Sequence, residues 1–206
     1  AVNLENTAKG ESHEFGFLQI RPMGNTVEVL PEVEDIDEKN AICVSHQVLG
    51  HGFIEDIRDI IYVSSSKLDR SKTTEIAGQI EQLNRKLRYL RCQSLLIGPG
   101  RWGSSDSWLG IPVRWNQISS VGCIVETPFP DMEVEPSQGT HFFQNITSQG
   151  IGYLTLKRKS SDYLDYDYLE NHSALKETKF LRHIHLYKPL RILINTRAKI
   201  GTIQLT

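Results

Sequence analysis

The chain has 206 residues, of which 39% are hydrophobic and 23% charged, and its formal net charge is −2. This ordinary globular composition gives room for one large domain, or for one domain and part of another. The small negative charge argues against a nucleic-acid-binding protein, and no apolar run reaches the roughly 20 residues that span a membrane. No signal-peptide pattern opens the sequence, so we expect a cytoplasmic protein. Its three widely spaced cysteines predict buried thiols, not a disulfide framework or a zinc site.

Residues 14–23 form the first clear strand, because apolar and polar side chains alternate along it. Gln19 and Arg21 then share one face. The segment that follows is acidic, contains Pro31 and has little apolar content, which is typical of a linker. We therefore expect three parts: residues 1–30, an acidic linker over residues 31–40, and a domain over residues 41–206.

Residues 41–45 and 60–63 are predicted to be strands, and residues 71–91 a helix. Apolar residues recur along the helix at the spacing of one buried face. Thr73 or Thr74 is expected to cap its start. Arg88 or Arg91 at its basic end is a candidate to face the glycine-rich loop that follows; the alternative, more usual for such a charge run, is that these side chains are solvated. A strand, a helix and another strand in this order suit a crossover unit of an open sheet.

The most informative stretch is residues 95–113, where an apolar strand runs into Gly98, Gly100 and Gly103. Glycines let a backbone approach a ligand closely, and Arg101 is suited to bind a phosphate or carboxylate. Asp106 is expected to cap a turn or hold a cation. The alternative is a tight crossing in which Trp102 and Trp108 simply pack and Arg101 pairs with an acid.

A second polar stretch covers residues 136–145, after a buried strand at residues 121–127. Ser137 or Thr140 is expected to cap a helix there, and Ser137, Gln138 and Thr140 at its start would suit an anion. His141 would donate to a phosphate or accept a phosphoryl group. Alternatively, His141 is a satisfied polar group above a core anchor formed by two phenylalanines, residues 142–143.

The remaining pattern predicts strands at residues 150–157, 180–186, 190–195 and 200–205, with a short helix within residues 162–171. The expected fold is α+β: a mixed sheet with one long helix and an antiparallel C-terminal portion. His183 and His185 would share a strand face, a spacing also found in metal sites. We expect His46 and His51 to have structural or solvent-facing roles.

Residues 18–22, Leu-Gln-Ile-Arg-Pro, resemble the Gln-x-Arg-Pro signature that closes the ATP-grasp domain of phosphoenolpyruvate synthases and pyruvate phosphate dikinases. The resemblance implies that residues 1–30 include the last strand of such a domain. It also implies that Gln19 and Arg21 reach the phosphates of ATP and Mg²⁺. The metal-binding glutamate of that family lies upstream, so Glu5, or a residue before Ala1, would join Gln19 at the metal.

The stretches at residues 96–113 and 136–145 resemble the C-terminal region of the same family, in the form found in Bacteroides-type bacteria. The resemblance covers nearly the whole chain, but the phosphohistidine motif and the phosphoenolpyruvate-binding barrel of complete synthases are missing. It implies the C-terminal domain of an ATP-dependent phosphotransferase, adjoining the ATP-grasp domain and inactive alone. Arg101 and the segment from Ser137 to His141 would then form a second site, for a small phosphorylated or carboxylate ligand, with Arg101 and His141 as candidate catalytic residues.

Two other classes of function remain open. A non-catalytic regulatory or protein-interaction module would present its tryptophans and phenylalanines as an exposed patch without converging polar groups. A ligand site would instead join Arg101, Asp106, Gln138 and His141 in one pocket. A hydrolase using Ser105, Asp106 and His141 is a third alternative, although the sequence fixes no triad geometry.

Overall fold

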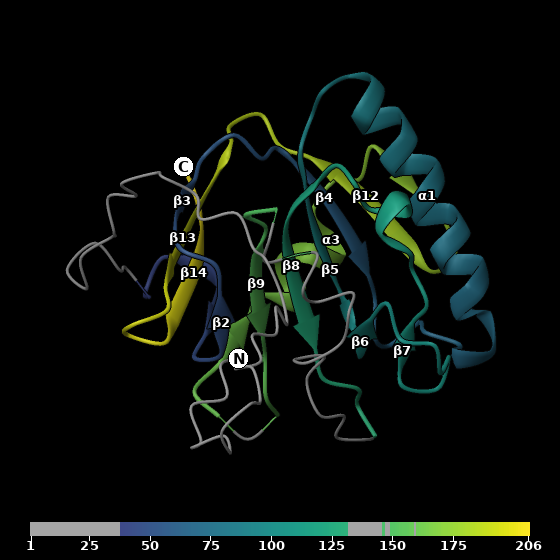
Figure 1. The fold of residues 1–206 in the computed structure, drawn as a ribbon, viewed down its shortest axis with the longest axis horizontal. Helices are drawn as coiled ribbons and strands as arrows, with labels where there is room; N and C mark the ends of the chain where they lie inside the picture. The colour runs from purple at the N-terminus through teal and green to yellow at the C-terminus, as the bar shows by residue number, and fades with distance from the viewer. Residues whose placement is uncertain (1–37, 132–145, 147–148, 159) are drawn as a thin grey trace, which may run out of the picture.

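The computed structural model describes residues 38–131, 146, 149–158 and 160–206. In this part of the chain two sheets lie face to face, and one long helix covers the outer face of the larger sheet (Figure 1). The expected mixed α+β fold with one long helix is therefore confirmed. The predictions for residues 1–37, including the ATP-grasp strand and most of the linker, lie outside the described residues.

The larger sheet has seven strands in the order β11-β12-β4-β5-β8-β9-β2. Its centre is four parallel strands: β4 (Asp59–Val63), β5 (Ser94–Pro99), β8 (Val121–Thr127) and β9 (Gly152–Thr155). The antiparallel strands β12 (Leu181–His185), β11 (Lys176–Glu177) and β2 (Val48–Leu49) complete its two sides. Every residue of the four parallel strands is buried, as expected for strands covered on both faces.

Helix α1 (Thr73–Tyr89) connects β4 to the parallel strand β5, which confirms the predicted crossover unit. Its buried residues pack on the side chains of the sheet that point outward, among them Ile61, Leu96 and Ile124. The expected cap at Thr73 or Thr74 is wrong. A short 3₁₀ helix, η2 (Arg70–Lys72), precedes α1, and its cap is Asp69. Lys72 therefore takes the N-cap position of α1 and makes no side-chain capping bond.

The other face of the larger sheet packs on a five-stranded antiparallel sheet in the order β10-β1-β14-β13-β3. Its strands are β1 (Ala41–Ser45), β3 (Gly52–Ile54), β10 (Tyr163–Leu164), β13 (Leu190–Asn195) and β14 (Ile200–Leu205). Between the sheets, Leu95 and Val125 share one core with Ile192 and Ile203. The predicted antiparallel C-terminal portion is thus confirmed.

Short helix α3 (Tyr166–Asn171) lies where its predicted segment placed it and is fastened to the carboxyl end of β4. The buried Tyr62 hydroxyl donates to Glu170 Oε1 at 3.0 Å, and Lys67 Nζ lies 3.5 Å from Glu170 Oε2. Burial raises the pKa of Tyr62 well above its ordinary value, so this phenol stays protonated and acts as a donor. This polar network holds α3 in place.

The glycine-rich loop crosses itself tightly where β6 (Arg101–Trp102) pairs in parallel with β7 (Gly110–Ile111). Trp102 is 1% exposed, and a Cβ atom on Gly98 would lie 2.8 Å from its ring. Gly100 has φ +71°, and a Cβ there would collide with the Phe129 ring and the Leu109 carbonyl. Gly98 and Gly100 are therefore required by packing and backbone conformation, as the alternative interpretation of this stretch proposed. That interpretation is wrong for Trp108, which is 62% exposed and does not pack in the core.

We predict that Gly100→Ala lowers the free energy of unfolding by about 2 kcal/mol or more, because it combines a positive φ with a backbone collision. The matched control is Gly78→Ala in α1, where a Cβ meets no atom within 4 Å. That change should raise stability by up to about 1 kcal/mol through helix propensity. Urea unfolding of both variants checks the contrast, and equal effects would contradict the assigned role of Gly100.

Candidate functional site

The carboxyl ends of parallel strands β4, β5 and β8 meet at one edge of the larger sheet, together with the amino end of α1 (Figure 1). In open α/β sheets, ligands bind outside this edge, because the loops that follow the strands converge there. The loop after β4 leads into η2, the loop after β5 contains the glycine stretch, and the segment after β8 runs to Asp131. All three contribute to a single pocket.

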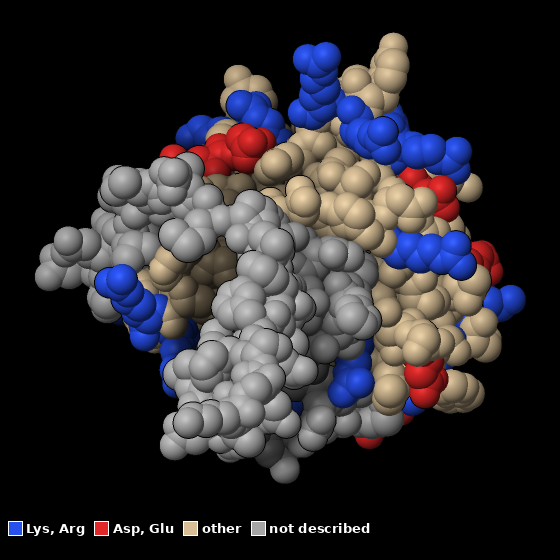
Figure 2. Space-filling view, viewed as in Figure 1, with Lys and Arg blue, Asp and Glu red and all other residues tan. Residues whose placement is uncertain are grey.

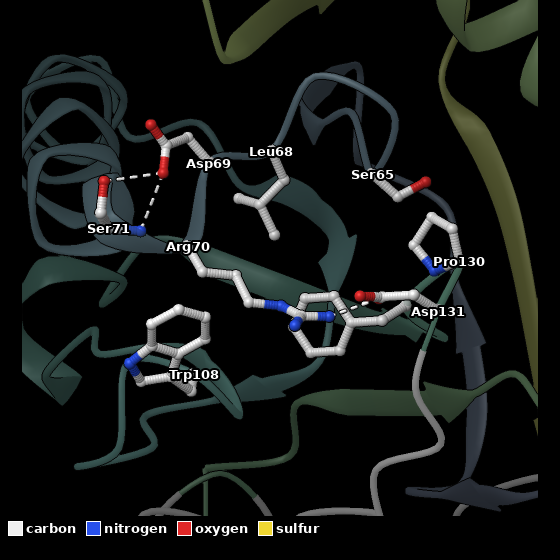
Figure 3. A pocket seen from close by; sticks show the side chains of 9 residues that line it. Ser65, Leu68, Asp69, Arg70, Ser71, Trp108, Pro130 and Asp131 are labelled. Carbon is white, nitrogen blue, oxygen red and sulfur yellow. Dashed lines mark hydrogen bonds and ion pairs between the residues drawn. The ribbon is translucent and has the colours of Figure 1, made fainter.

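The pocket has a volume of about 510 Å³ and combines polar, charged and aromatic side chains (Figure 3). Its lining residues are Ser65, Leu68, Asp69, Arg70, Ser71, Trp108, Phe129, Pro130 and Asp131. Arg70 is the one cation in this lining, and it comes from the loop between β4 and α1. The pocket is large enough for a small-molecule ligand.

The Arg70 guanidinium is held in place by two contacts. It lies over the Phe129 ring, 4.5 Å from the centroid, and it forms an ion pair with Asp131 (Figure 3). The Arg70 side chain is 18% exposed, whereas that of Asp131 is 66% exposed. The cation is therefore partly desolvated and ordered, while its carboxylate partner faces solvent.

Trp108 lines the same pocket and is 62% exposed, so the face of its indole is accessible to a ligand. Its backbone N–H donates to Asp106 Oδ1 at 2.9 Å, which confirms that Asp106 caps a turn. Asp69 accepts from the Ser71 N–H and hydroxyl at 3.0 and 2.7 Å, and these bonds lower its pKa. Since Asp69 is engaged in this turn, Arg70 and Trp108 are the groups best placed to meet a ligand.

The residues predicted from sequence are only partly brought together. Arg101 is half-buried in β6, where its backbone N–H donates to Leu109, and it does not line this pocket. Arg88 lies at the carboxyl end of α1 and Arg91 just after it, at the opposite edge of the sheet from the glycine loop. Both are exposed, so the alternative of solvated side chains is confirmed and a contact with the loop is not. In Figure 2, Lys and Arg side chains gather along the top of the molecule, the side on which the carboxyl end of α1 lies in Figure 1. Several predicted site residues lie outside the described part of the chain: Glu5, Gln19, Arg21, Ser137, Gln138, Thr140 and His141.

Sequence reasoning missed Arg70, Phe129 and Asp131. One signal was present: Asp69 stands two residues before Ser71 at the start of a helical segment, a pattern that favours a side-chain-capped turn. Once the crossover from β4 to β5 is predicted, the loop after β4 must lie beside the glycine stretch. The pairing of Arg70 with Asp131, 61 residues apart, left no local signal.

A second polar cluster lies at the opposite edge of the same sheet. His183 Nε2 and His185 Nδ1 are 2.7 and 3.0 Å from Asp59 Oδ1. Burial alone would raise the pKa of Asp59, but the hydrogen bonds and positive charge of the two histidines outweigh burial and lower it. The predicted shared face of His183 and His185 is thus confirmed, with a carboxylate partner that sequence did not identify.

His46 and His51 each make a polar side-chain contact, and two of the three cysteines are buried. His46 Nδ1 lies 2.9 Å from Asp162 Oδ1, and His51 contacts the Thr196 hydroxyl, so both have structural contacts at the surface. Cys43 and Cys123 are buried thiols, as predicted, and Cys92 is half-buried. Within the described residues, no group of three or more His, Cys, Asp or Glu is arranged to hold a metal ion.

No family model, curated protein or solved structure matches this chain. In the described part of the chain, no helix is both long and apolar enough to cross a membrane.

We predict that Asp59→Asn lowers the free energy of unfolding by about 1–3 kcal/mol at pH 7, because two donors lose a buried anionic acceptor. Since the folded-state pKa of Asp59 is depressed, the stabilisation is present above its unfolded pKa of about 3.9 and is lost as the pH falls below it. The difference between variant and parent should thus shrink towards pH 3. Urea unfolding at both pH values measures it, and a pH-independent difference would contradict the role of charge.

Proposed function

We propose that this chain is the C-terminal domain of a phosphoenolpyruvate synthase-like, ATP-dependent phosphotransferase, and that its carboxyl-edge pocket binds the anionic group of a small ligand. The observation that carries this proposal is Arg70, an ordered and partly desolvated cation between Phe129 and Asp131 in a pocket of about 510 Å³. The sequence resemblance adds the reaction class, and we propose that the domain is inactive without the ATP-grasp domain.

Arg70 is suited to this task because a guanidinium binds phosphate or carboxylate with two parallel hydrogen bonds. A bound anion would take the place of Asp131, whose exposed carboxylate loses little when it returns to water. The ligand would then lie between Arg70 and the exposed indole of Trp108. A planar group on the ligand would gain stacking contact there.

Phosphoryl transfer depends on positioning and on charge neutralisation more than on covalent chemistry by the protein. Within this chain, we assign neutralisation of a substrate anion to Arg70. We assign the phosphates of ATP and Mg²⁺ to Gln19 and Arg21, with Glu5 or an upstream glutamate at the metal, as the resemblance implies. Arg101, Ser137, Gln138, Thr140 and His141 remain candidates for a second anion contact in the parent protein.

The alternative of a non-catalytic interaction module is less well supported by the described residues. Trp102 is buried in the core beneath Gly98, so it is not part of a docking surface. Trp108 is exposed but lines a pocket with a cation and several hydroxyl and carboxyl groups. The two tryptophans therefore do not form one apolar patch, which was the expected feature of such a module.

We predict that the chain binds at least one of phosphate, pyruvate, phosphoenolpyruvate and MgATP, and that Arg70→Gln weakens this binding by about tenfold or more. Loss of a charge-assisted hydrogen bond costs about 1.5–3 kcal/mol, which corresponds to this range. Isothermal titration calorimetry measures the affinities. Arg85→Gln is the matched control, because Arg85 is an exposed cation on α1, paired only loosely with Glu81.

Three outcomes distinguish a ligand site at Arg70 from a site elsewhere in the chain and from the absence of an autonomous site. Binding that is weakened by Arg70→Gln and not by Arg85→Gln supports the pocket. Binding that is insensitive to Arg70 would move the site elsewhere in the chain. No binding of any of the four ligands by the folded chain would contradict an autonomous ligand site.

A further inference from the structure

The cluster of Asp59, His183 and His185 lies at the amino edge of the larger sheet, away from the carboxyl-edge pocket. His185 is the strand partner of Asp59 across the antiparallel pair β12 and β4, and His183 is two residues away on the same face. Asp59 is 4% exposed, and its Oδ1 is the oxygen that both imidazoles contact. Each ring is thus oriented by its own contact with Asp59.

The contacts also fix the position of the ring protons. The lowered pKa of Asp59 keeps it a carboxylate at neutral pH, and a carboxylate only accepts hydrogen bonds. His183 must therefore donate from Nε2 and His185 from Nδ1. Consequently, whenever the His185 ring is neutral, its lone pair resides on Nε2, the nitrogen on the far side of the ring from Asp59.

Accessibility separates the two histidines. The side chain of His183 is 2% exposed and that of His185 is 50% exposed. His183 is therefore enclosed in the core, whereas a small molecule can reach the His185 ring. An imidazole whose Nδ1–H is held by a buried carboxylate is an oriented base and nucleophile at Nε2, because the carboxylate stabilises the positive charge that develops on the ring.

The charges around this edge favour an anionic reagent. Arg58 precedes Asp59, and its guanidinium donates to the Tyr187 carbonyl at 2.6 Å, beside the end of β12. Lys188 is exposed three residues after His185, and Lys176 on β11 is the strand partner of His183. Asp56 is the nearest further acid along the segment that leads into β4. Two further acids on these segments, Glu55 and Glu177, are paired with Arg191 and Arg182. Arg58, Lys176 and Lys188 therefore leave a positive balance against Asp56, which favours an anionic reagent at this edge.

We propose that His185 Nε2 is a phosphoryl-accepting nucleophile, positioned by Asp59, for small reactive phosphoryl donors. With phosphoramidate as donor, the Nε2 lone pair forms a new bond to phosphorus. The bond from phosphorus to the amide nitrogen breaks, and ammonia leaves with that electron pair. The ring proton remains on Nδ1, where the Asp59 carboxylate balances the charge of the phosphorylated imidazolium.

The chain offers a matched comparison in His46. Its Nδ1 also contacts a carboxylate, Asp162, and its side chain is 40% exposed. However, Asp162 also accepts from the backbone N–H groups of His46 and Lys157, both at 2.8 Å. Its charge is thus shared with a loop, and Ser161 Oγ lies 3.3 Å from the same ring nitrogen. We expect His46 to react more slowly than His185.

The test treats the whole chain with phosphoramidate at pH 7.5 and measures phosphorylation of each histidine over time by peptide mass spectrometry under alkaline conditions. We expect His185 to react faster than His46 and His172. Asp59→Asn should slow His185 by about tenfold or more, because the ring then loses the carboxylate that sets its tautomer and balances its positive charge. His183→Gln should leave His185 at least as reactive, because Asp59 then serves one imidazole.

A merely structural cluster gives a different pattern. In that case His185 reacts no faster than His46 or His172, or Asp59→Asn leaves its rate unchanged in a chain that circular dichroism shows to be folded. Either result would overturn the proposal. If Asp59→Asn fails to fold, His183→Gln decides: loss of His185 reactivity in that folded variant contradicts the assignment, and retained selectivity for His185 supports it.

Discussion

The burial of both faces of four parallel strands is the constraint on which the rest of this structure depends. Alternate side chains of β4, β5 and β8 enter two separate cores, one beneath α1 and one against the five-stranded sheet. Apolar area buried in this way contributes about 25 cal/mol per Å² and requires a cover on each side. The helix layer and the second sheet are those covers. The two polar clusters of the larger sheet described above accordingly lie at the edges where its strands end.

The two edges differ in the chemistry that they carry. At the carboxyl edge, loops after three strands converge around Arg70, Trp108 and Asp131, and the exposed groups leave space between them. At the amino edge, strand residues themselves supply Asp59 and two histidines. An ordered cation suits reversible binding of an anion, whereas an oriented imidazole suits a covalent step. The proposals for the two edges are therefore independent of each other.

The regular elements could be predicted from sequence because their signals are local. The apolar runs of β5 and β8 and the 3.6-residue period of α1 each specify one element. The two-residue strands β2, β10 and β11 carry too few residues for such a pattern. They exist because longer neighbours offer them free edges.

The functional groups were harder to predict, because each depends on a contact between distant parts of the chain. Asp59 and His183 are 124 residues apart in sequence, and only the pairing of β12 with β4 brings them together. Trp102 and Trp108 looked equivalent in the sequence, yet one is buried and the other is 62% exposed. Gly98 contributes to this difference, because the absence of a side chain there makes room for the Trp102 ring.

The central claim is that ligands bind at the carboxyl edge beside Trp108, and the three tryptophan indoles of the chain report on it directly. A ¹H–¹⁵N correlation spectrum resolves one indole N–H signal for each of Trp102, Trp108 and Trp115. During titration with phosphoenolpyruvate or MgATP, the account predicts that the Trp108 signal shifts saturably, while that of the buried Trp102 moves little. Saturable binding that leaves the Trp108 signal unmoved would contradict the claim.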